Sequence, residues 1–370
     1  MATSFQDRRW MKVALGAARV GMGRTGPNPA VGCALLSADG QLLAVGSTAR
    51  GGRPHAETTA LSKIKTGAAR GGTAYVTLEP CAHHAKTGPC AEALIAAEVA
   101  RVVVASKDPD PRVNGGGIQM LRDAGIDVTV GVCAAEAHVI MSGFLTRIAT
   151  SKPFVTVKTA TSLDGMIALA DRKQRWLTGP EMRRFVHLER SYADGILTGI
   201  GTVLADNPSL TCRLPGLSAD NPHRFIMDSQ LRCPVDAALF DDSTPVTIFC
   251  APTAASDNEA ALVARGASVI RLEADADGRA GIEPMLRIVA DLGCNHLMVE
   301  AGAGLVTALV ASQSVDRFVW TQSNHIIGSD GIPAIGVLNA VELQADMHYM
   351  HGRRFGADNV QIFTKAAHVS

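Results

Sequence analysis

The chain has 370 residues, of which 47% are hydrophobic and 19% charged, so it can form two domains that each have a core. Its 35 basic and 35 acidic residues give a formal net charge of zero, which disfavours a broad electrostatic surface for nucleic acid or membrane. No apolar run is long enough to span a bilayer, and the N-terminal stretch fits an amphipathic helix better than a targeting signal. We therefore expect a cytoplasmic protein that binds neither nucleic acid nor membrane.

The first half of the chain alternates apolar runs with helical patterns. Strands are predicted at 30–36, 72–78, 100–106 and 126–132. Helices are predicted near the N-terminus and at 55–65, 90–99 and 117–125, the last closed by Gly125. This β–α–β rhythm predicts an α/β fold, in which a sheet carries helices on both faces.

A second series of the same kind begins with a strand predicted at 154–160. Further strands are predicted at 195–199, 223–229, 245–251, 267–273 and 296–302, with helices at 180–192 and 282–293. The polar segment that ends at Pro153 is the expected boundary. We therefore expect two domains, 1–150 and 151–370.

Eight cysteines are spread along the chain without a secretory signal, so a disulfide framework is not expected. Most of them are expected to be small buried hydrophobic residues. Cys81 and Cys90 differ from the others, because each directly follows a proline and the triplet His55-Ala56-Glu57 precedes them.

His55, Cys81 and Cys90 form a candidate zinc site. Zinc prefers thiolate and imidazole ligands in tetrahedral geometry, and a catalytic site keeps one position for water. Two thiolates would cancel the charge of the ion, and the bound water would lose a proton near neutral pH. Pro54 suits a helix start, where Glu57 in the first turn could take this proton and deliver it to a leaving amine. The pattern predicts a zinc-dependent deaminase.

Other interpretations of these residues stay open. Both cysteines could be core residues, since a His-x-Glu triplet is common by itself. The metal could also support a non-catalytic scaffold, which would need a fourth protein ligand. His83 and His84 could be further ligands, line the site or meet solvent.

The triplet "HAE" followed by "PC…C" resembles the cytidine deaminase superfamily, although eight residues separate the cysteines here. "PNPAVGCALL", "TLEPCAHHAKTGPC" and "DPDPRVNGGG" together resemble the deaminase half of the bifunctional riboflavin-biosynthesis deaminase–reductases. The resemblance implies an N-terminal cytidine-deaminase-like α/β/α sandwich. It also implies substrate contacts from Asn28, His83, Lys86, Asp108 and Asn114.

Two glycine-rich turns follow apolar strands in the second half, at 197–208 and 299–309. Such turns let backbone N–H groups approach phosphates at a helix start. Neither turn completes the G-x-G-x-x-G pattern, because Leu204 and Thr307 occupy the third glycine position. From these residues alone, a phosphate-binding loop and a plain turn both remain open.

Further motifs resemble the reductase half of the same family: "VKTATSLDGMIA", "RWLTGPE", "TGIGTVLADNPSLTCR", "DSQLR" and "VEAGAGL". The resemblance implies a C-terminal dihydrofolate-reductase-like α/β domain that uses NADPH. The cofactor contacts that it implies are Ala160, Trp176, Thr202, Asp206, Ser229, Gly302, Ala303, Gly304, Leu305, Val306, Thr307 and Ala308. The substrate contacts that it implies are Gln174, Arg190, Leu210, Arg213 and Glu300.

Four charged residues of this half carry the expected chemistry. Lys158 and Asp206 are the expected catalytic residues, and Lys158 could polarise or protonate the sugar oxygen. Arg190 and Arg213 suit forked binding of a substrate phosphate. The alternative for Lys158 is a surface position at a strand end, and for the arginines it is an ordinary surface ion pair.

We therefore predict a bifunctional enzyme of riboflavin biosynthesis with Zn²⁺ and NADPH as cofactors. The first domain would deaminate 2,5-diamino-6-(5-phosphoribosylamino)pyrimidin-4-one by zinc-hydroxide attack. The second would reduce 5-amino-6-(5-phosphoribosylamino)uracil to the ribityl compound, and it could also form a homo-oligomer. The alternative is a nucleoside or tRNA deaminase fused to an unrelated reductase-like domain. An aromatic content of 4% and the balanced charge disfavour an RNA substrate.

Overall fold

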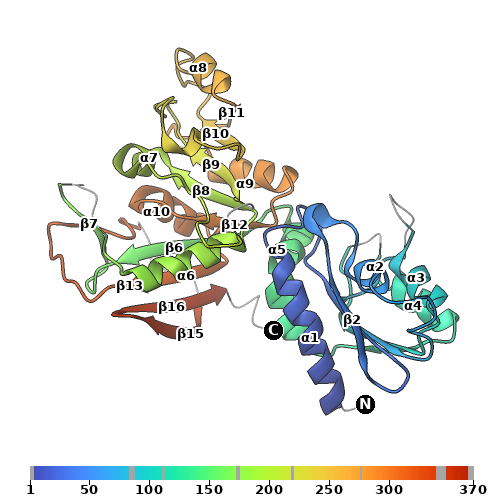
Figure 1. The fold of residues 1–370 in the computed structure, drawn as a ribbon. Coiled ribbons are helices and arrows are strands. Elements are labelled where there is room, and N and C mark those ends of the chain that lie inside the picture. The colour runs from blue at the N-terminus through green and yellow to red at the C-terminus, as the bar shows by residue number, and fades with distance from the viewer. Residues whose placement is uncertain are drawn as a thin grey trace. The chain divides into compact units, whose positions relative to one another are not determined.

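The chain divides into two compact units, Met1–Thr150 and Ser151–Ser370 (Figure 1). The computed structural model describes residues 4–82, 88–110, 113–171, 176–217, 221–275, 277–338 and 347–365. Each unit combines helices with a sheet, which confirms the predicted α/β class. Among the described residues, no helix combines the length and the apolarity needed to cross a membrane.

The first unit is built on a five-stranded sheet in the order β2-β1-β3-β4-β5. Strand β1 pairs antiparallel with β2 and β3, whereas β3, β4 and β5 run parallel. The strands are β1 (Gly32–Leu36), β2 (Leu42–Ser47), β3 (Thr73–Leu78), β4 (Arg101–Ser106) and β5 (Asp127–Val130). The strands predicted in this half are confirmed, while β2 was not predicted.

Two glycines show how helices cover both faces of this sheet. A Cβ atom on Gly32 would lie 1.9 Å from the Ala14 carbonyl oxygen, and one on Gly46 would lie 2.2 Å from that of Ala56. Because Gly46 pairs with Cys33, the neighbour of Gly32, the two glycines point to opposite faces. Ala14 belongs to α1 (Phe5–Gly21) and Ala56 to α2 (Ala56–Leu61), so these two helices pack closely on opposite sides of the sheet.

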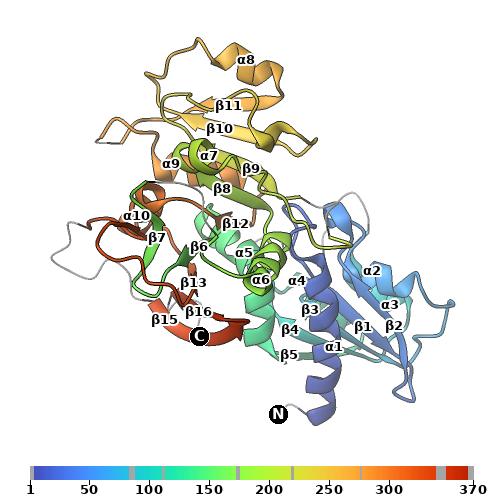
Figure 2. The same ribbon diagram turned by 60° about the vertical axis from the view of Figure 1, so that its left-hand side comes forward.

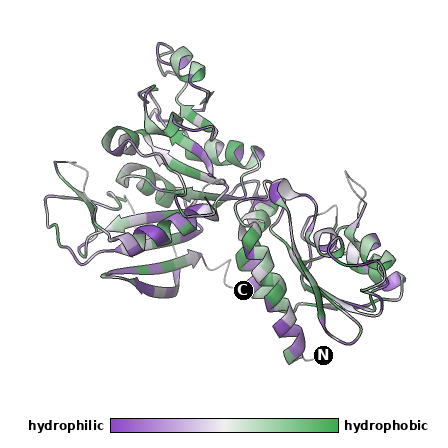
Figure 3. Cartoon of the chain, in the orientation of Figure 1, coloured by the Kyte–Doolittle hydropathy of each residue, from purple (hydrophilic) through white to green (hydrophobic). Residues whose placement is uncertain are grey.

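The remaining helices of the unit complete the predicted α/β/α sandwich (Figure 2). Helix α5 packs beside α1 and against β3 and β4, while α3 and α4 continue the layer begun by α2. The helices are α1 (Phe5–Gly21), α2 (Ala56–Leu61), α3 (Cys90–Ala96), α4 (Gly116–Asp123) and α5 (Ala134–Thr150), with a short 3₁₀ helix at Arg50–Gly52. Helix α1 carries both hydrophilic and hydrophobic residues (Figure 3), and its buried residues recur every three or four positions, as the predicted amphipathic pattern requires.

The second unit contains a nine-stranded sheet in the order β11-β10-β9-β8-β12-β6-β13-β16-β15. The first seven strands in this order are parallel, β16 runs antiparallel to β13, and β15 runs antiparallel to β16. The strands are β6 (Phe154–Thr161), β8 (Gly195–Gly199), β9 (His223–Met227), β10 (Val246–Cys250), β11 (Ala267–Arg271), β12 (His296–Val299), β13 (Arg317–Gln322), β15 (Met347–Phe355) and β16 (Asp358–Lys365). A separate pair is formed by β7 (Met166–Leu169) and β14 (Gly331–Pro333).

Alternation along the strands divides most apolar residues of this unit between two large cores, and a smaller third cluster is formed by Met182, Val319, Val360 and Ile362. Ile196 and Ile248 belong to one core, and their neighbours Leu197 and Phe249 belong to the other. Helices α6, α7 and α8 contribute to the first core, and α9 and α10 to the second. These helices are α6 (Pro180–Ser191), α7 (Ile200–Asp206), α8 (Glu259–Ala264), α9 (Ile282–Asp291) and α10 (Ala303–Ala311), with a 3₁₀ turn at Ala238–Phe240. The sheet is therefore covered on both faces.

His296 at the start of β12 is a neutral hydrogen-bonding link inside the second unit. Its Nδ1 lies 3.1 Å from the Tyr192 carbonyl oxygen, so it donates there, and Nε2 lies 2.8 Å from the Thr156 hydroxyl, which donates to it. Desolvation lowers the pKa of His296 to about 4. The ring therefore stays neutral in the folded state at a pH where it is protonated in the unfolded chain.

We predict that His296 makes the second unit less stable as the pH falls from about 6.5 towards 4, because the unfolded state then binds more protons. Since the ring keeps some exposure, a loss of about 1 kcal/mol in unfolding free energy is expected between pH 7 and pH 5. Calorimetry of His296→Gln should show a smaller loss than wild type. The exposed His351→Gln should behave like wild type, and equal losses in all three proteins would exclude His296 as the source.

Candidate active sites

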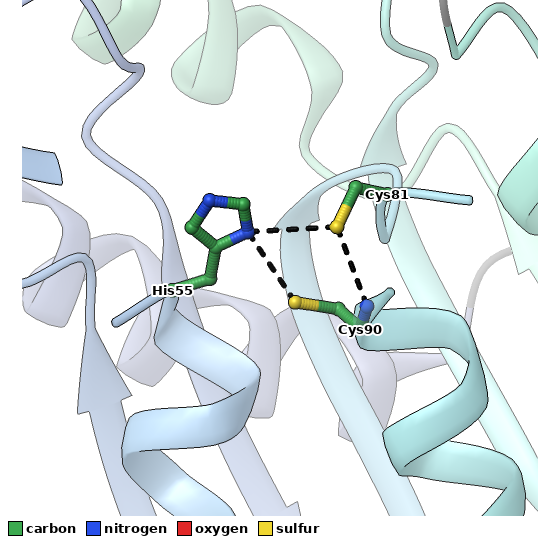
Figure 4. A group of neighbouring side chains, drawn as sticks. All are labelled: His55, Cys81 and Cys90. Atoms are coloured by element: carbon green, nitrogen blue, oxygen red, sulfur yellow. Dashed lines mark hydrogen bonds between the residues drawn. The ribbon is translucent and has the colours of Figure 1, made fainter. Parts of the chain in front are cut away.

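Three side chains from separate segments of the first unit meet at one point (Figure 4). His55 is the N-cap residue of α2, and Cys90 is the first residue of α3. Cys81 lies in the connection that follows β3. The prolines before His55 and Cys90 predicted that helices begin at these positions, and both helices do. Pro54 directly precedes the N-cap residue of α2, and Pro89 is the N-cap residue of α3.

The geometry of this cluster suits a zinc ion. The Nδ1 atom of His55 lies 3.6 Å from Cys81 Sγ and 3.4 Å from Cys90 Sγ, and all three ligand atoms lie within 4.8 Å of one another. Tetrahedral zinc with ordinary Zn–N and Zn–S bonds separates nitrogen from sulfur by about 3.5 Å. Within the described part of the chain, this is the one such cluster of His, Cys and acidic groups found.

The electrostatics of the cluster favour a metal-binding thiolate. The hydrogen bond with the Cys90 thiol, followed by that with His55, lowers the pKa of Cys81 to about 4 although burial opposes this shift. The Cys81 sulfur also accepts a hydrogen bond of 3.3 Å from the Cys90 backbone N–H. The hydrogen bond between the two sulfurs raises the pKa of Cys90, so the first negative charge lies on Cys81.

Glu57 lies in the first turn of α2, two residues after His55, and only 3% of it is exposed. Burial raises the pKa of its carboxyl group to about 7. The charge of His55 lowers this pKa, and the charge of Cys81 raises it. Sequence reasoning placed Glu57 in a first turn so that it could face the metal site, and its position in α2 agrees with this.

The other expected substrate contacts that the structure describes in the first unit lie on two loops. Asn28 precedes β1, and its side-chain amide packs on Gly52, where a Cβ atom would lie 1.9 Å from Nδ2. Asp108 is buried after β4, and Asn114 is exposed just before α4. The expected contacts His83 and Lys86 lie outside the described residues.

The second unit contains a cleft of about 1770 Å³ where several parallel strands end. Its lining includes the starts of α7 and α10, which follow β8 and β12. The carboxyl edge of an open parallel sheet is the usual place for a nucleotide. Most of the residues predicted for this half line the cleft, namely Lys158, Ala160, Trp176, Arg190, Thr202, Asp206, Leu210, Arg213, Ser229, Glu300, Gly302, Ala303, Gly304, Leu305 and Ala308.

Two of the expected cofactor contacts have other partners. Val306 is fully buried in the apolar core. The Thr307 hydroxyl donates to the Ala303 carbonyl oxygen at 2.6 Å and accepts the Gly336 N–H at 2.7 Å. Neither residue is part of the cleft lining, so the predicted 302–308 turn faces the cleft through residues 302–305 and Ala308. Gln174 lies outside the described residues.

Arg190, Glu300 and Lys158 form a charged group at the cleft. The Arg190 guanidinium donates to both oxygens of Glu300, at 2.5 and 3.0 Å, and to the Thr211 carbonyl oxygen at 2.8 Å. Lys158 Nζ lies 3.8 Å from the same carboxylate. Burial opposes ionisation of Glu300, but the charges of Arg190 and Lys158 lower its pKa to about 2.

This arrangement separates the two arginines that were expected to bind phosphate together. The donors of Arg190 already bond to Glu300 and Thr211, whereas Arg213 is exposed and its Nη1 donates to the Ser209 hydroxyl at 3.1 Å. Desolvation lowers the pKa of Lys158. Its side chain is mostly buried, so it is not the exposed lysine at a strand end that was considered as the alternative. Arg190 is therefore suited to holding Glu300, and Arg213 to meeting an anion.

The cleft also contains residues to which sequence reasoning gave no role. Gln230 and Arg232 follow β9, and Thr253 and Arg279 come from later loops. The Ser229 hydroxyl accepts the Ala280 N–H at 3.1 Å, which joins two of these loops. No sequence spacing connects these positions, because they meet only through the order of the parallel strands.

Comparison with known proteins identifies both halves. Residues 4–106 match the cytidine and deoxycytidylate deaminase zinc-binding region, and residues 153–360 match the RibD C-terminal domain. The riboflavin biosynthesis protein RibD of Aquifex aeolicus is 36% identical over 87% of this chain and 88% of its own length. The chain belongs to the RibD family. RibD of Escherichia coli is 38% identical over 88% of this chain and 89% of its own length.

Solved RibD structures share the whole fold. Acinetobacter baumannii RibD has a TM-score of 0.87 at 32% identity and covers 97% of this chain and 98% of its own. A Thermotoga maritima diaminohydroxyphosphoribosylaminopyrimidine deaminase/5-amino-6-(5-phosphoribosylamino)uracil reductase has a TM-score of 0.86 at 29% identity, covering 98% and 99% of the two chains. The RibD relationship spans both halves and so excludes an unrelated second domain.

As a RibD protein, the chain is a bifunctional enzyme of riboflavin biosynthesis, with an aminohydrolase and an oxidoreductase activity. Zinc serves its deaminase domain, and NADPH serves its reductase domain. The predicted family, fold class and cofactors are confirmed.

We predict that Cys81→Ser and Cys90→Ser each lose stoichiometric zinc and deamination, because a serine hydroxyl is a poor substitute for a thiolate ligand. Metal analysis of the purified proteins measures the first effect, and ammonia release the second. Buried Cys250, in the second unit, supplies the matched control, since Cys250→Ser should keep its zinc. Tight zinc binding by both site variants would show that the ligand set is different.

Proposed function

We propose that the first unit deaminates 2,5-diamino-6-(5-phosphoribosylamino)pyrimidin-4-one, and that the second unit then reduces 5-amino-6-(5-phosphoribosylamino)uracil with NADPH. The observation that carries this proposal is the pairing of a His-Cys-Cys-Glu cluster in one unit with a large charged cleft in the other. The name of the Thermotoga maritima relative, which lists both activities, supports the same substrates.

In the deaminase unit, His55, Cys81 and Cys90 would hold the zinc ion. When bound, zinc supplies Lewis-acid activation of a water molecule at neutral pH. Glu57 takes the proton of the attacking water and delivers it to the amino group that leaves as ammonia. Its burial beside the ligand cluster, with 3% exposure, favours this role over that of a surface carboxylate.

Substrate binding in this unit is assigned to Asn28, Asp108 and Asn114, together with His83 and Lys86. Amide and carboxylate groups suit the donors and acceptors on a pyrimidine edge, and a lysine suits the phosphate. The contact between Asn28 and Gly52 supports the role of Asn28, because Gly52 lies three residues before the metal ligand His55.

In the reductase unit, the nicotinamide cofactor supplies the hydride that reaches C1′ of the opened ribose. The starts of α7 and α10 would approach the cofactor phosphates through their backbone N–H groups. The Gly302 N–H donates to the Thr202 hydroxyl at 3.2 Å and so joins the two helix starts. Ala160, Trp176, Asp206 and Ser229 would complete the cofactor site. This role is supported by their shared position on the cleft wall.

Lys158 is the proposed proton donor to the sugar oxygen that is released when the ring opens. Its side chain is mostly buried, with 14% exposure, and Glu300 beside it keeps a negative charge close to the ammonium group. Arg190 keeps Glu300 in place. Asp206, called catalytic from the sequence, is exposed at the end of α7 and better suits a cofactor contact.

We further propose that the protein acts in the cytoplasm and binds no nucleic acid, which its zero net charge supports. A homo-oligomer formed through the reductase domain remains a prediction, which light scattering of the purified chain tests.

Glu57→Gln is predicted to retain zinc and to lose deamination by at least about a hundredfold, because the amide keeps the shape of the side chain but cannot accept the proton. Ammonia release and metal content are the two measurements. The exposed Glu98→Gln, in the same unit, should retain both. Near-normal deamination by Glu57→Gln would assign the proton transfer to another group.

Arg213→Met is predicted to raise the KM of the reductase for its phosphorylated substrate by roughly tenfold to a few hundredfold, the cost of a charged hydrogen bond. Methionine keeps the length of the side chain and removes the charge. The exposed Arg353→Met on β15 is the control. If Arg213→Met keeps the full wild-type preference over a dephosphorylated analogue, the phosphate binds elsewhere.

A further inference from the structure

Glu79 lies between β3 and Cys81, and none of the roles above uses it. It is buried, with 3% exposure. Its backbone N–H donates to the Ser106 carbonyl oxygen at 2.9 Å, which ties the end of β3 to the end of β4. The side chain therefore begins at the edge of the sheet from which both Cys81 and Asp108 continue.

The Glu79 carboxylate accepts four backbone N–H groups. Its Oε2 accepts those of Asp108 at 3.2 Å and Gly115 at 3.0 Å. Its Oε1 accepts those of Gly117 at 3.0 Å and Ile118 at 3.2 Å. Both oxygens are thus used by the main chain of one segment, which runs from the end of β4 into the first turn of α4.

The two oxygens do different work in that segment. Oε2 joins the two ends of the loop from Asp108 to Gly115, and Asn114 directly precedes the second end. Oε1 satisfies N–H groups in the first turn of α4, which have no partners within the helix. A carboxylate is favoured there by charge-assisted hydrogen bonds and by the helix dipole.

The same helix start is packed directly against the residue that precedes Cys81. A Cβ atom on Gly117 would lie 1.8 Å from the Pro80 carbonyl oxygen. Glycine is required at this position because the first turn of α4 approaches the backbone so closely. Glu79 and Pro80 therefore connect two segments. One carries the metal ligand Cys81, and the other carries Asp108 and Asn114.

We propose that Glu79 is a positioning residue for deamination, which sets Asp108 and Asn114 at a fixed place relative to the His55-Cys81-Cys90 cluster. It acts on substrate binding through the loop and touches neither the substrate nor the reacting atoms. This inference rests on the proposed function, in which Asp108 and Asn114 contact the pyrimidine substrate.

Glu79→Gln tests the proposal most directly. The amide keeps the length of the side chain, but its NH₂ group replaces one acceptor oxygen and faces two N–H donors. We expect the KM for the diaminopyrimidine substrate to rise roughly tenfold or more, whereas kcat changes less than about threefold. Zinc should remain stoichiometric, and reduction of supplied uracil intermediate should be unchanged.

Asp7→Asn is the matched control for a general loss of stability in the same unit. Asp7 is also a buried carboxylate, and it accepts hydrogen bonds from Arg101 at 2.7 Å and from Tyr75 at 3.0 Å. This variant should lower the melting temperature without changing the KM. A Glu79→Gln protein that is only less stable, with a wild-type KM, would overturn the proposal, as would loss of its zinc.

Asp108→Asn separates this proposal from the function on which it rests. If Asp108→Asn leaves the KM unchanged, the proposed substrate site is wrong. If Asp108→Asn raises the KM and Glu79→Gln does not, the positioning role alone is wrong. Should Glu79→Gln fail to fold, Glu79→Asp supplies the second test, because it keeps the negative charge but shortens the side chain by one methylene group, so that it cannot hold all four N–H groups and should raise the KM in the same way. An unchanged KM in that variant would also overturn the proposal.

Discussion

In both units, functional side chains gather where parallel strands end and helices begin. Cys81 and Asp108 follow β3 and β4, and Glu300 follows β12. Parallel strands end at a common edge of the sheet, so residues distant in sequence come together there. The helix starts at this edge also provide unpaired N–H groups. The rest of each active site depends on this arrangement, because it brings negatively charged side chains and the backbone N–H groups of helix starts to one place.

The two sites use this edge for different charges. The first unit gathers two sulfurs and an imidazole, an arrangement that favours a divalent cation. The second unit instead pairs Glu300 with Arg190 and Lys158 beside a cleft with two helix starts in its wall. That charge balance leaves the helix starts and Arg213 to meet anionic groups. One fold principle thus supports hydrolysis in one unit and hydride transfer in the other.

Local patterns predicted many of the strands, because each is a short apolar run. The candidate metal ligands were noticed because of the His-x-Glu triplet and the prolines before both cysteines. The apolar run at 195–199 coincides with β8, and Pro89 before Cys90 marks the start of α3. The pairing of Arg190 with Glu300 could not be predicted, since it depends on the strand order that brings α6 beside β12. Glu79 was missed for a similar reason: its partners are backbone N–H groups, which have no sequence signature. Strand β15 also escaped prediction, because its exposed residues show no apolar alternation.

The central claim is that one chain performs both reactions in order, and mass spectrometry of the products tests it most directly. The purified protein with zinc would be given the diaminopyrimidine phosphate, with and without NADPH. Without NADPH, the account predicts a product in which one amino group is replaced by oxygen. With NADPH, it predicts a further gain of two hydrogens on the sugar chain. Unchanged starting material in the first reaction, or no hydrogen gain in the second, would contradict the account.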